Sequence, residues 1–273
     1  MNQLVGEKLS IITSKAQTTR HRIMGIVNGE DFQIVYSDTP GILDPKYKLQ
    51  ESMMSFVRSA MVDADILLLV TDVHETPDKL RIDLNKLQNV DMQVIVLVNK
   101  IDLMQQAQVE SLFDAWRLAL PDASVVAISA LHGFNTDILM EKLIEAIPEG
   151  PAYFPKDELT DKPMRFFVSE IVREKILLNY QQEIPYSCEV LVESYKDEES
   201  IVRIRTLIIV SRDSQKNIII GSKGSALKKV GTEARKDIES FLDKKVFLEL
   251  FVKVDKNWRN DATKLKRYGY IER

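Results

Sequence analysis

Four residues with the chemistry of a phosphate and metal site follow a short apolar run near the N-terminus. Asp38-Thr39-Pro40-Gly41 comes directly after Phe32 to Tyr36, which has the composition of a strand ending in a turn. An aspartate in such a turn can hold Mg²⁺, directly or through water. Gly41 leaves room for its backbone N–H to approach a terminal phosphate. Because this tetrapeptide also occurs by chance, its interpretation depends on the rest of the chain.

A second polar tetrapeptide, Asn99-Lys100-Ile101-Asp102, follows the apolar run Val94 to Val98. A carboxylate at Asp102 can accept two hydrogen bonds from the N1 and N2 edge of guanine, whereas adenine offers the opposite pattern. Asn99 is suited to N7 or O6 of the base, and the methylene stem of Lys100 to the face of the purine ring. Alone, Asn-Lys-x-Asp is a common surface turn.

A third segment, Ser129-Ala130, follows the apolar run Val125 to Ile128, and its backbone can reach O6 of the base. The three segments occur in one order, each after a run with the composition of a strand. Together they predict a site for a guanine nucleotide.

The elements that must position these residues alternate between strand and helix. Asn28-Gly29 between two apolar runs predicts a hairpin. After a helix around residues 49–60, buried strands at 66–70, 94–98 and 125–128 alternate with helical patterns around 80–87, 109–120 and 138–147. This order predicts a mostly parallel sheet, whose ligands bind at the C-terminal ends of the strands.

Composition limits the class of protein. The 273 residues have room for two domains, and 45% hydrophobic with 29% charged residues excludes a disordered chain. A single cysteine, Cys188, excludes an internal disulfide framework, and no apolar run approaches membrane-spanning length. With no signal-peptide pattern at the N-terminus, these features predict a soluble, cytoplasmic protein.

Charge and proline content divide the chain. Residues 201–273 carry 18 Lys and Arg against 9 Asp and Glu, whereas the whole chain carries 37 against 41. A basic block of this kind suggests a polyanion partner, although solvated helix faces give the same count. Four of the nine prolines lie within residues 148–163. We therefore expect domains at 1–148 and 164–273, joined by a linker at 149–163.

The second domain contains a glycine loop between two helical patterns. Ile218-Ile219-Ile220 runs into Gly221-Ser222-Lys223-Gly224, and Lys228 and Lys229 follow one turn into an amphipathic helix. Two glycines allow a sugar-phosphate backbone to approach, and the helix N-terminus favours anions. The isoleucines would form an apolar floor under splayed bases. The alternative is a plain helix–helix corner with core isoleucines.

The C-terminal tail from Lys256 is basic and contains Trp258, Tyr268 and Tyr270. Interleaved aromatic and basic residues suit RNA stacking and phosphate contact. A solvated C-terminal helix explains the same composition equally well.

These motifs resemble known families. The order helix, strand, strand, helix, G-x-x-G, helix, strand resembles a type II KH domain. Thr18-Thr19-Arg20, Asp38-Thr39-Pro40-Gly41, Asn99-Lys100-Ile101-Asp102 and Ser129-Ala130 resemble a translation-factor-class P-loop GTPase, and the stretch Ile12 to Arg22 is similar to the Era family. The resemblance implies an α/β GTPase-like domain, lacking its first strand, followed by an α+β KH domain.

The resemblance also implies roles. Thr19, with Thr18 as the alternative, would reach Mg²⁺ and the terminal phosphate; Asp38 would bind Mg²⁺ through water, and the Gly41 amide would sense the γ-phosphate. Ile42 replaces a glutamine found in many GTPases, which implies slow hydrolysis. The implied catalytic residues are Thr19, Asp38 and Gly41. The implied nucleotide site comprises Asp38, Thr39, Pro40, Gly41, Ile42, Asn99, Lys100, Ile101, Asp102, Ser129 and Ala130. The implied RNA site comprises Ile219, Ile220, Gly221, Ser222, Lys223, Gly224, Lys228 and Lys229.

The cofactors and partners implied are GTP or GDP, Mg²⁺, 16S rRNA and the 30S ribosomal subunit. The function implied is that of a GTPase that assists small-subunit maturation. The family also implies a peripheral location on the inner membrane face, which no residue here shows, and no protein partner can be deduced.

One part of the family pattern does not occur in the sequence. No G-x-x-x-x-G-K-S/T loop, whose amides would cradle the phosphates, is found among the 273 residues. Met1 resembles an internal methionine in the helix after that loop, so we expect an N-terminally incomplete domain with an unpaired gap in its sheet. We also expect very weak GTP binding and negligible hydrolysis. The alternative function is a non-enzymatic RNA-binding protein with an inactive nucleotide domain.

Overall fold

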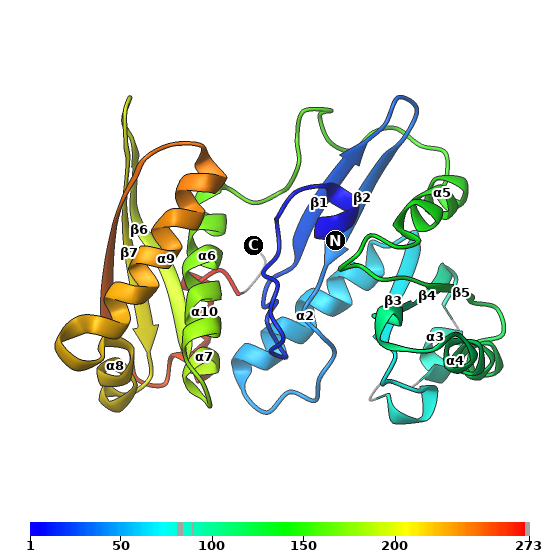
Figure 1. Ribbon diagram of the computed structural model, residues 1–273, viewed down its shortest axis with the longest axis horizontal. Helices are drawn as coiled ribbons and strands as arrows, with labels where there is room; N and C mark the ends of the chain where they lie inside the picture. The colour runs from blue at the N-terminus through cyan, green and yellow to red at the C-terminus, as the bar shows by residue number, and fades with distance from the viewer. Residues whose placement is uncertain (81–83, 89, 271–273) are drawn as a thin grey trace. The chain divides into compact units, whose positions relative to one another are not determined.

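The computed structural model describes residues 1–80, 84–88 and 90–270 (Figure 1). The chain forms two compact units, and each unit is built from segments that are not consecutive in the sequence. Unit 1 comprises Met1–Lys8, Met24–Asp38 and Val57–Thr160, and unit 2 comprises Leu9–Ile23, Thr39–Phe56 and Asp161–Arg273. Two N-terminal segments therefore belong to the same unit as residues 161–273. The predicted boundary at 149–163 spans the change between units, and the three-part domain assignment itself stays a prediction.

The elements up to residue 147 follow the predicted alternation. In chain order they are α1 (Asn2–Val5), β1 (Ile23–Asn28), β2 (Gln33–Asp38), α2 (Lys48–Val62), β3 (Ile66–Asp72), a 3₁₀ turn (Pro77–Lys79), α3 (Leu84–Gln88), β4 (Gln93–Asn99), a 3₁₀ turn (Ile101–Leu103), α4 (Gln106–Ala119), β5 (Ser124–Ala127) and α5 (Thr136–Ala146). The part of the predicted helix at 81–83 lies outside the described residues.

These strands form two sheets. β3, β4 and β5 pair in parallel in the order β3-β4-β5, and β1 and β2 form a separate two-stranded sheet. Ile34 and Tyr36 of β2 nevertheless share a hydrophobic core with Ile95 and Leu97 of β4. β2 and β3 are not hydrogen-bonded neighbours. This arrangement agrees with the expected gap in the sheet.

The proline-rich segment is held along the β1–β2 hairpin. The backbone N–H of Ile26 donates to Leu159 O at 2.9 Å. The Gln33 side chain accepts hydrogen bonds from the N–H groups of Tyr153 (2.8 Å) and Phe154 (3.0 Å), and donates to Phe154 O (2.8 Å). One glutamine thus satisfies backbone groups of an extended segment that has no strand partner of its own.

The C-terminal part contains the predicted helix, strand, strand, helix, loop, helix, strand order. Its elements are α6 (Met164–Asn179), α7 (Ile184–Ser187), β6 (Cys188–Asp197), β7 (Val202–Val210), α8 (Asp213–Ile220), a 3₁₀ turn (Ser222–Gly224), α9 (Ser225–Leu242), β8 (Val246–Val254), a 3₁₀ turn (Trp258–Asn260) and α10 (Ala262–Arg267). β6 and β7 are antiparallel, and β7 and β8 are parallel.

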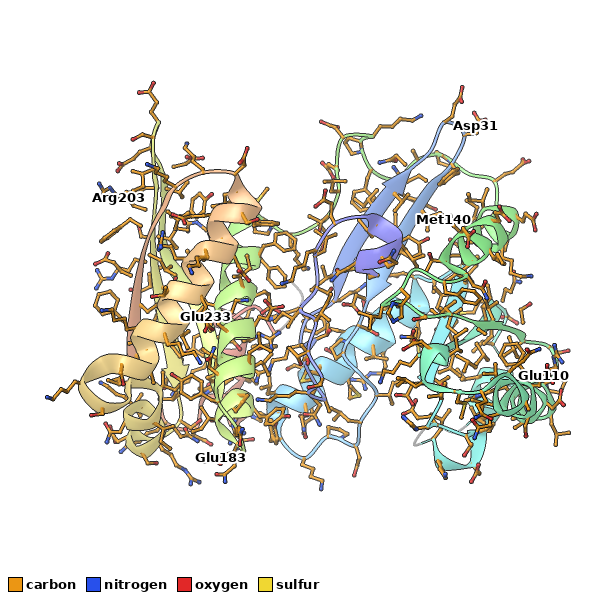
Figure 2. The ribbon with its side chains drawn as sticks, in the orientation of Figure 1. Asp31, Glu110, Met140, Glu183, Arg203 and Glu233 are labelled. Carbon is orange, nitrogen blue, oxygen red and sulfur yellow. The ribbon has the colours of Figure 1, made fainter. Side chains whose placement is uncertain are left out.

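α6 and α9 cover one face of this sheet (Figure 1). The core between helices and sheet contains Val168 and Val172 of α6 and Ile238 of α9. The Asn179 side chain donates to Glu233 Oε2 of α9 at 2.6 Å, which joins the two helices (Glu233 is labelled in Figure 2). Cys188 is fully buried in the same core, and burial raises the pKa of its thiol to about 11. Cys188 is therefore a core residue whose thiol stays protonated at neutral pH.

Across the described ranges, no helix has both the length and the apolar character needed to cross a bilayer.

Candidate functional site

The polar residues after β4 and β5 meet at one end of the sheet. Parallel pairing aligns Val98 with Ala127, so the segments that follow both strands leave the sheet side by side. The Asn99 side-chain oxygen accepts from the Ala130 N–H at 3.0 Å and from the Lys100 N–H at 2.8 Å. The predicted grouping of these two loops is therefore present, and Asn99 ties them together.

Asp102 is held as an ionised hydrogen-bond acceptor. The Ser129 hydroxyl donates to Asp102 Oδ1 at 2.6 Å, and this bond lowers the pKa of the carboxyl below its ordinary value. The other oxygen, Oδ2, is 3.9 Å from His132 Nε2, and the Asp102 side chain is 26% exposed. The carboxylate is thus fixed in direction while it keeps acceptor capacity for a purine edge.

Lys100 is fixed by a residue that the sequence analysis missed. Its backbone is left-handed, with φ of 64°. Its Nζ pairs with Asp72 Oδ2 at 2.7 Å, and Asp72 Oδ1 accepts from the His74 N–H at 2.9 Å. Burial alone would raise the pKa of Asp72, but the bonds from Lys100 and His74 hold it below its ordinary value. The available signal was a carboxylate at the end of a buried strand, in register with Asn99.

Ile101 contributes to the site through its backbone. Its N–H donates to Ile128 O at 3.4 Å, and its side chain packs against the hydrophobic core that includes Leu69, Val96 and Trp116. Ile101 thus positions its neighbours, and a nucleotide contact by Ile101 itself stays a prediction.

The segment Asp38 to Ile42 begins where β2 ends. Pro40 is buried, Gly41 and Ile42 are exposed, and Asp38 and Thr39 are intermediate. A Cβ on Gly41 would meet no atom within 4 Å, so the backbone is open to an approaching group. Asp38 belongs to unit 1, whereas residues from Thr39 belong to unit 2.

Thr18 and Thr19 differ in how their hydroxyl groups are used. The Thr18 hydroxyl donates to Lys15 O at 2.7 Å and lies 3.1 Å from the Thr13 hydroxyl. Because the Thr18 oxygen is engaged, Thr19 suits a metal better. Residues 1–80, 84–88 and 90–270 hold no cluster of three or more His, Cys, Asp or Glu side chains arranged for a metal. The predicted Mg²⁺ site, in which phosphate oxygens would supply further ligands, is not of that kind and stays a prediction.

The glycine loop joins α8 to α9 as predicted. Gly221 has φ of 71°, and a Cβ there would lie 2.7 Å from Ala226 Cβ, so this position requires glycine. Lys223, which has φ of 50°, is exposed, as are Ser222 and, in the first turn of α9, Lys228 and Lys229. The structure therefore presents three cations around the N-terminus of an 18-residue helix.

Two parts of the predicted RNA surface need correction. The Ile219 side chain is fully buried in the core, so it cannot form a floor under bases; Ile218 is exposed and Ile220 is intermediate. In the tail, Trp258 and Tyr270 are fully buried and Tyr268 is 8% exposed. These rings stabilise the tail against the domain, and none is available to stack on RNA.

Two family models match the chain. The model described as a 50S ribosome-binding GTPase matches residues 1–100, and the KH domain model matches residues 183–259.

Curated relatives align over nearly the whole chain. GTPase Era of Syntrophus aciditrophicus is 44% identical over 276 residues, which cover 100% of this chain and 90% of that protein. The chloroplastic ERA-like GTPase of Oryza sativa is 44% identical over 275 residues, covering 99% of this chain, and the chloroplastic GTPase ERA1 of Zea mays is also 44% identical. The chain spans 65% and 66% of the lengths of these two plant relatives.

A solved structure has the same fold. The crystal structure of Era in complex with MgGDPNP and nucleotides 1506–1542 of 16S ribosomal RNA superposes with a TM-score of 0.93 at 37% identity. The match covers 99% of this chain and 93% of that one. The chain contains the Asn99–Asp102 loop expected of a guanine-nucleotide site and a G-x-x-G loop, and it is similar to these proteins over its whole length. It therefore belongs to the Era GTPase family.

Proposed function

We propose that this protein binds and hydrolyses GTP, binds 16S rRNA near its 3′ end, and assists maturation of the 30S subunit. The observation that carries the nucleotide part is the hydrogen bond from Ser129 to Asp102, together with the bond from Ala130 to Asn99. These bonds arrange an ionised carboxylate and a backbone segment for the guanine edge before any ligand is present, which lowers the ordering cost of binding.

We take Thr19, Asp38 and Gly41, which the family resemblance implies, as the residues that would meet the phosphates. The oxygens of Thr19 and Asp38 suit Mg²⁺, which when bound neutralises charge on the phosphates. The Gly41 N–H would donate to the terminal phosphate. Thr39 and Pro40 shape the turn that presents it. Ile42 has no group that could orient an attacking water, so intrinsic hydrolysis would be slow.

The RNA part of the proposal is supported by charge and space at the glycine loop. Lys223, Lys228 and Lys229 are exposed around a helix N-terminus, where phosphates are stabilised. Lys229 is 3.9 Å from Glu233, a long exposed contact that phosphate can displace. The crystallised Era relative, which contains 16S rRNA nucleotides 1506–1542, supports this RNA as the ligand.

The alternative is an RNA-binding protein that uses no nucleotide. It rests on the glycine loop and the exposed lysines Lys223, Lys228 and Lys229 alone. Under this alternative the loop Asn99-Lys100-Ile101-Asp102 binds no nucleotide, and Asp102 only stabilises the end of the sheet. A preference for guanine over other bases distinguishes the GTPase from this alternative, even where the affinity for nucleotide is low.

The test is a change of base preference. Asp102→Asn replaces an acceptor with a donor, so it should weaken GDP and strengthen XDP, whose ring carries an oxygen where guanine has its amino group. We expect the GDP-to-XDP affinity ratio, measured by calorimetry at high ligand concentration, to fall by about 100-fold. Asp114→Asn, which removes the same charge from an exposed position on α4, should leave the ratio unchanged. Equal affinity of the wild-type chain for GDP, XDP and ADP would rule out the nucleotide function.

The cellular location is part of the same proposal. We propose a cytoplasmic protein with peripheral attachment at the inner membrane face, supported only by the family resemblance. Cell fractionation with and without a high-salt wash tests it, since a peripheral protein is released by salt and a protein found only in the soluble fraction contradicts the attachment.

A further inference from the structure

A segment near the N-terminus is hydrogen-bonded along helix α6 within unit 2. The Ile12 N–H donates to Glu174 Oε1 at 3.5 Å, and Arg173 Nη2 donates to Thr18 O at 2.6 Å. Arg173 is itself held by Glu170 through its Nε at 2.7 Å. The backbone immediately before Thr19 is thus fixed by side chains of the C-terminal part of the chain.

Lys15 attaches this segment to the end of α6. Its ammonium donates to the backbone oxygens of Leu177, in the last turn of the helix, and of Tyr180, the residue that caps it. A cation at this end is also favoured by the helix dipole. Lys15 O accepts the Thr18 hydroxyl at 2.7 Å, so one residue joins Thr18 to the helix end.

Tyr180 continues the connection to the glycine loop. Its hydroxyl donates to Ile219 O at 2.6 Å, two residues before Gly221. The Tyr180 side chain is 7% exposed, and burial raises the pKa of its phenol to about 12, so the donor keeps its proton at neutral pH. The hydrogen bonds of Thr18, Lys15 and Tyr180 therefore connect the Thr18–Thr19 segment to Ile219, two residues before the loop.

We propose that Lys15 and Tyr180 are positioning residues of the RNA-binding loop, through which RNA affinity depends on the conformation of the Thr18–Thr19 segment. This inference deepens the proposed function, because it takes the loop as the RNA site and Thr19 as the Mg²⁺ ligand. By linkage, the effect is reciprocal: RNA that binds better to the connected state must stabilise the connection. A change at Thr19 then reaches the loop without any ligand touching both.

The variant that isolates this connection is Tyr180→Phe. It removes one hydroxyl and keeps the ring, but it leaves the Ile219 carbonyl without its donor. Tyr36→Phe is the matched control, since Tyr36 is also 7% exposed and its hydroxyl donates to Met140 Sδ at 3.4 Å, in unit 1 (Met140 is labelled in Figure 2). Lys15→Met removes the ammonium that donates to Leu177 O and Tyr180 O, and it keeps a side chain of similar length.

The experiment measures RNA affinity and amide exchange together. The probe is a single-stranded RNA of about 10 nucleotides with the sequence of the 3′ end of 16S rRNA. We expect Tyr180→Phe and Lys15→Met each to weaken binding about fivefold, and Tyr36→Phe to leave it unchanged. RNA should slow hydrogen exchange of residues 13–20 in the wild-type protein and in Tyr36→Phe, but not in Tyr180→Phe.

The outcomes separate this inference from the function on which it rests. If Tyr180→Phe binds as tightly as Tyr36→Phe, or if RNA protects residues 13–20 equally in both, the connection is overturned while the RNA site stands. If the wild-type chain does not bind the RNA, the proposed function itself fails.

Discussion

The Ser129 hydroxyl donates a hydrogen bond of 2.6 Å to the Asp102 carboxylate at the C-terminal end of the β3-β4-β5 sheet. Ser129 is almost fully buried, whereas Asp102 is partly exposed. The buried hydroxyl therefore directs a carboxylate that faces solvent. This one bond accounts for both the orientation of the carboxylate and its low pKa.

Ser129→Ala should raise the pKa of Asp102 toward its ordinary value, because the hydrogen bond that favours the ionised form is lost. Carbon NMR titration of the Asp102 carboxyl measures this shift directly. His132→Ala is the control, since His132 is a more distant and weaker influence at 3.9 Å and should change the titration much less. An Asp102 pKa that is the same in Ser129→Ala and the wild type would contradict this account.

A pair of substitutions at Gly224 tests the RNA loop. Gly224 has φ of 78°, and a Cβ there would meet no atom within 4 Å, so a side chain fits but its backbone is strained. Asp and Asn tolerate this conformation similarly, and only Asp adds charge. Gly224→Asp should weaken single-stranded RNA binding about tenfold more than Gly224→Asn, because a carboxylate repels the phosphates. Equal losses in the two variants would mean that phosphates do not approach this loop.

Local patterns in the sequence predicted the loops but not the packing around them. Asn99-Lys100-Ile101-Asp102 and Ser129-Ala130 could be placed together because parallel strands end at the same edge of a sheet. Ile219 could not be assigned to the core, since three consecutive isoleucines have no periodicity that distinguishes the buried position. In the same way, the aromatic residues of the tail fit either stacking on RNA or packing within the domain.

The segment Leu9–Ile23 was the least predictable part of the chain. It contains no regular element before Ile23, and its grouping with the C-terminal unit depends on contacts more than 150 residues away, such as that of Arg20 with Cys188. A buried arginine also departs from the usual exposure of charged residues. Its partners are Glu189 and two carbonyl oxygens. They lie far from Arg20 in the sequence, so no local pattern identifies them.

Arg20 should contribute strongly to stability because it is buried with its partners. It donates to Cys188 O at 2.7 Å and Pro185 O at 3.1 Å, and it pairs with Glu189 at 3.4 Å. Arg20→Met leaves a buried carboxylate unpaired, and we expect it to lower the free energy of unfolding by about 3 kcal/mol. Urea denaturation followed by circular dichroism measures the change.

The control for Arg20 is an exposed arginine with a similar pairing. Arg203 pairs with Glu198 at 3.1 Å, but both side chains are about half exposed. Arg203→Met should therefore lower the free energy of unfolding by less than about 1 kcal/mol. If the two substitutions cost the same, burial of Arg20 does not determine its contribution.

His21 should make stability depend on pH. Its ring stacks on Tyr270, with centroids 4.4 Å apart, and meets Phe166 edge to face. Burial lowers its pKa from 6.5 to about 4, an effect that Glu170 opposes and Arg173 reinforces. The unfolded chain therefore binds a proton on this histidine between about pH 6.5 and pH 4 and the folded chain does not, so stability falls as the pH drops through this range.

His21→Phe removes this titration while an aromatic ring remains against Tyr270 and Phe166. We expect the free energy of unfolding of the variant to fall less than that of the wild type between about pH 6.5 and pH 4, as measured by urea denaturation at several pH values. Carboxyl groups that do not interact with His21 are common to both proteins and cancel in the difference. Parallel curves for the wild type and His21→Phe would show that His21 is protonated in the folded protein as readily as in the unfolded chain.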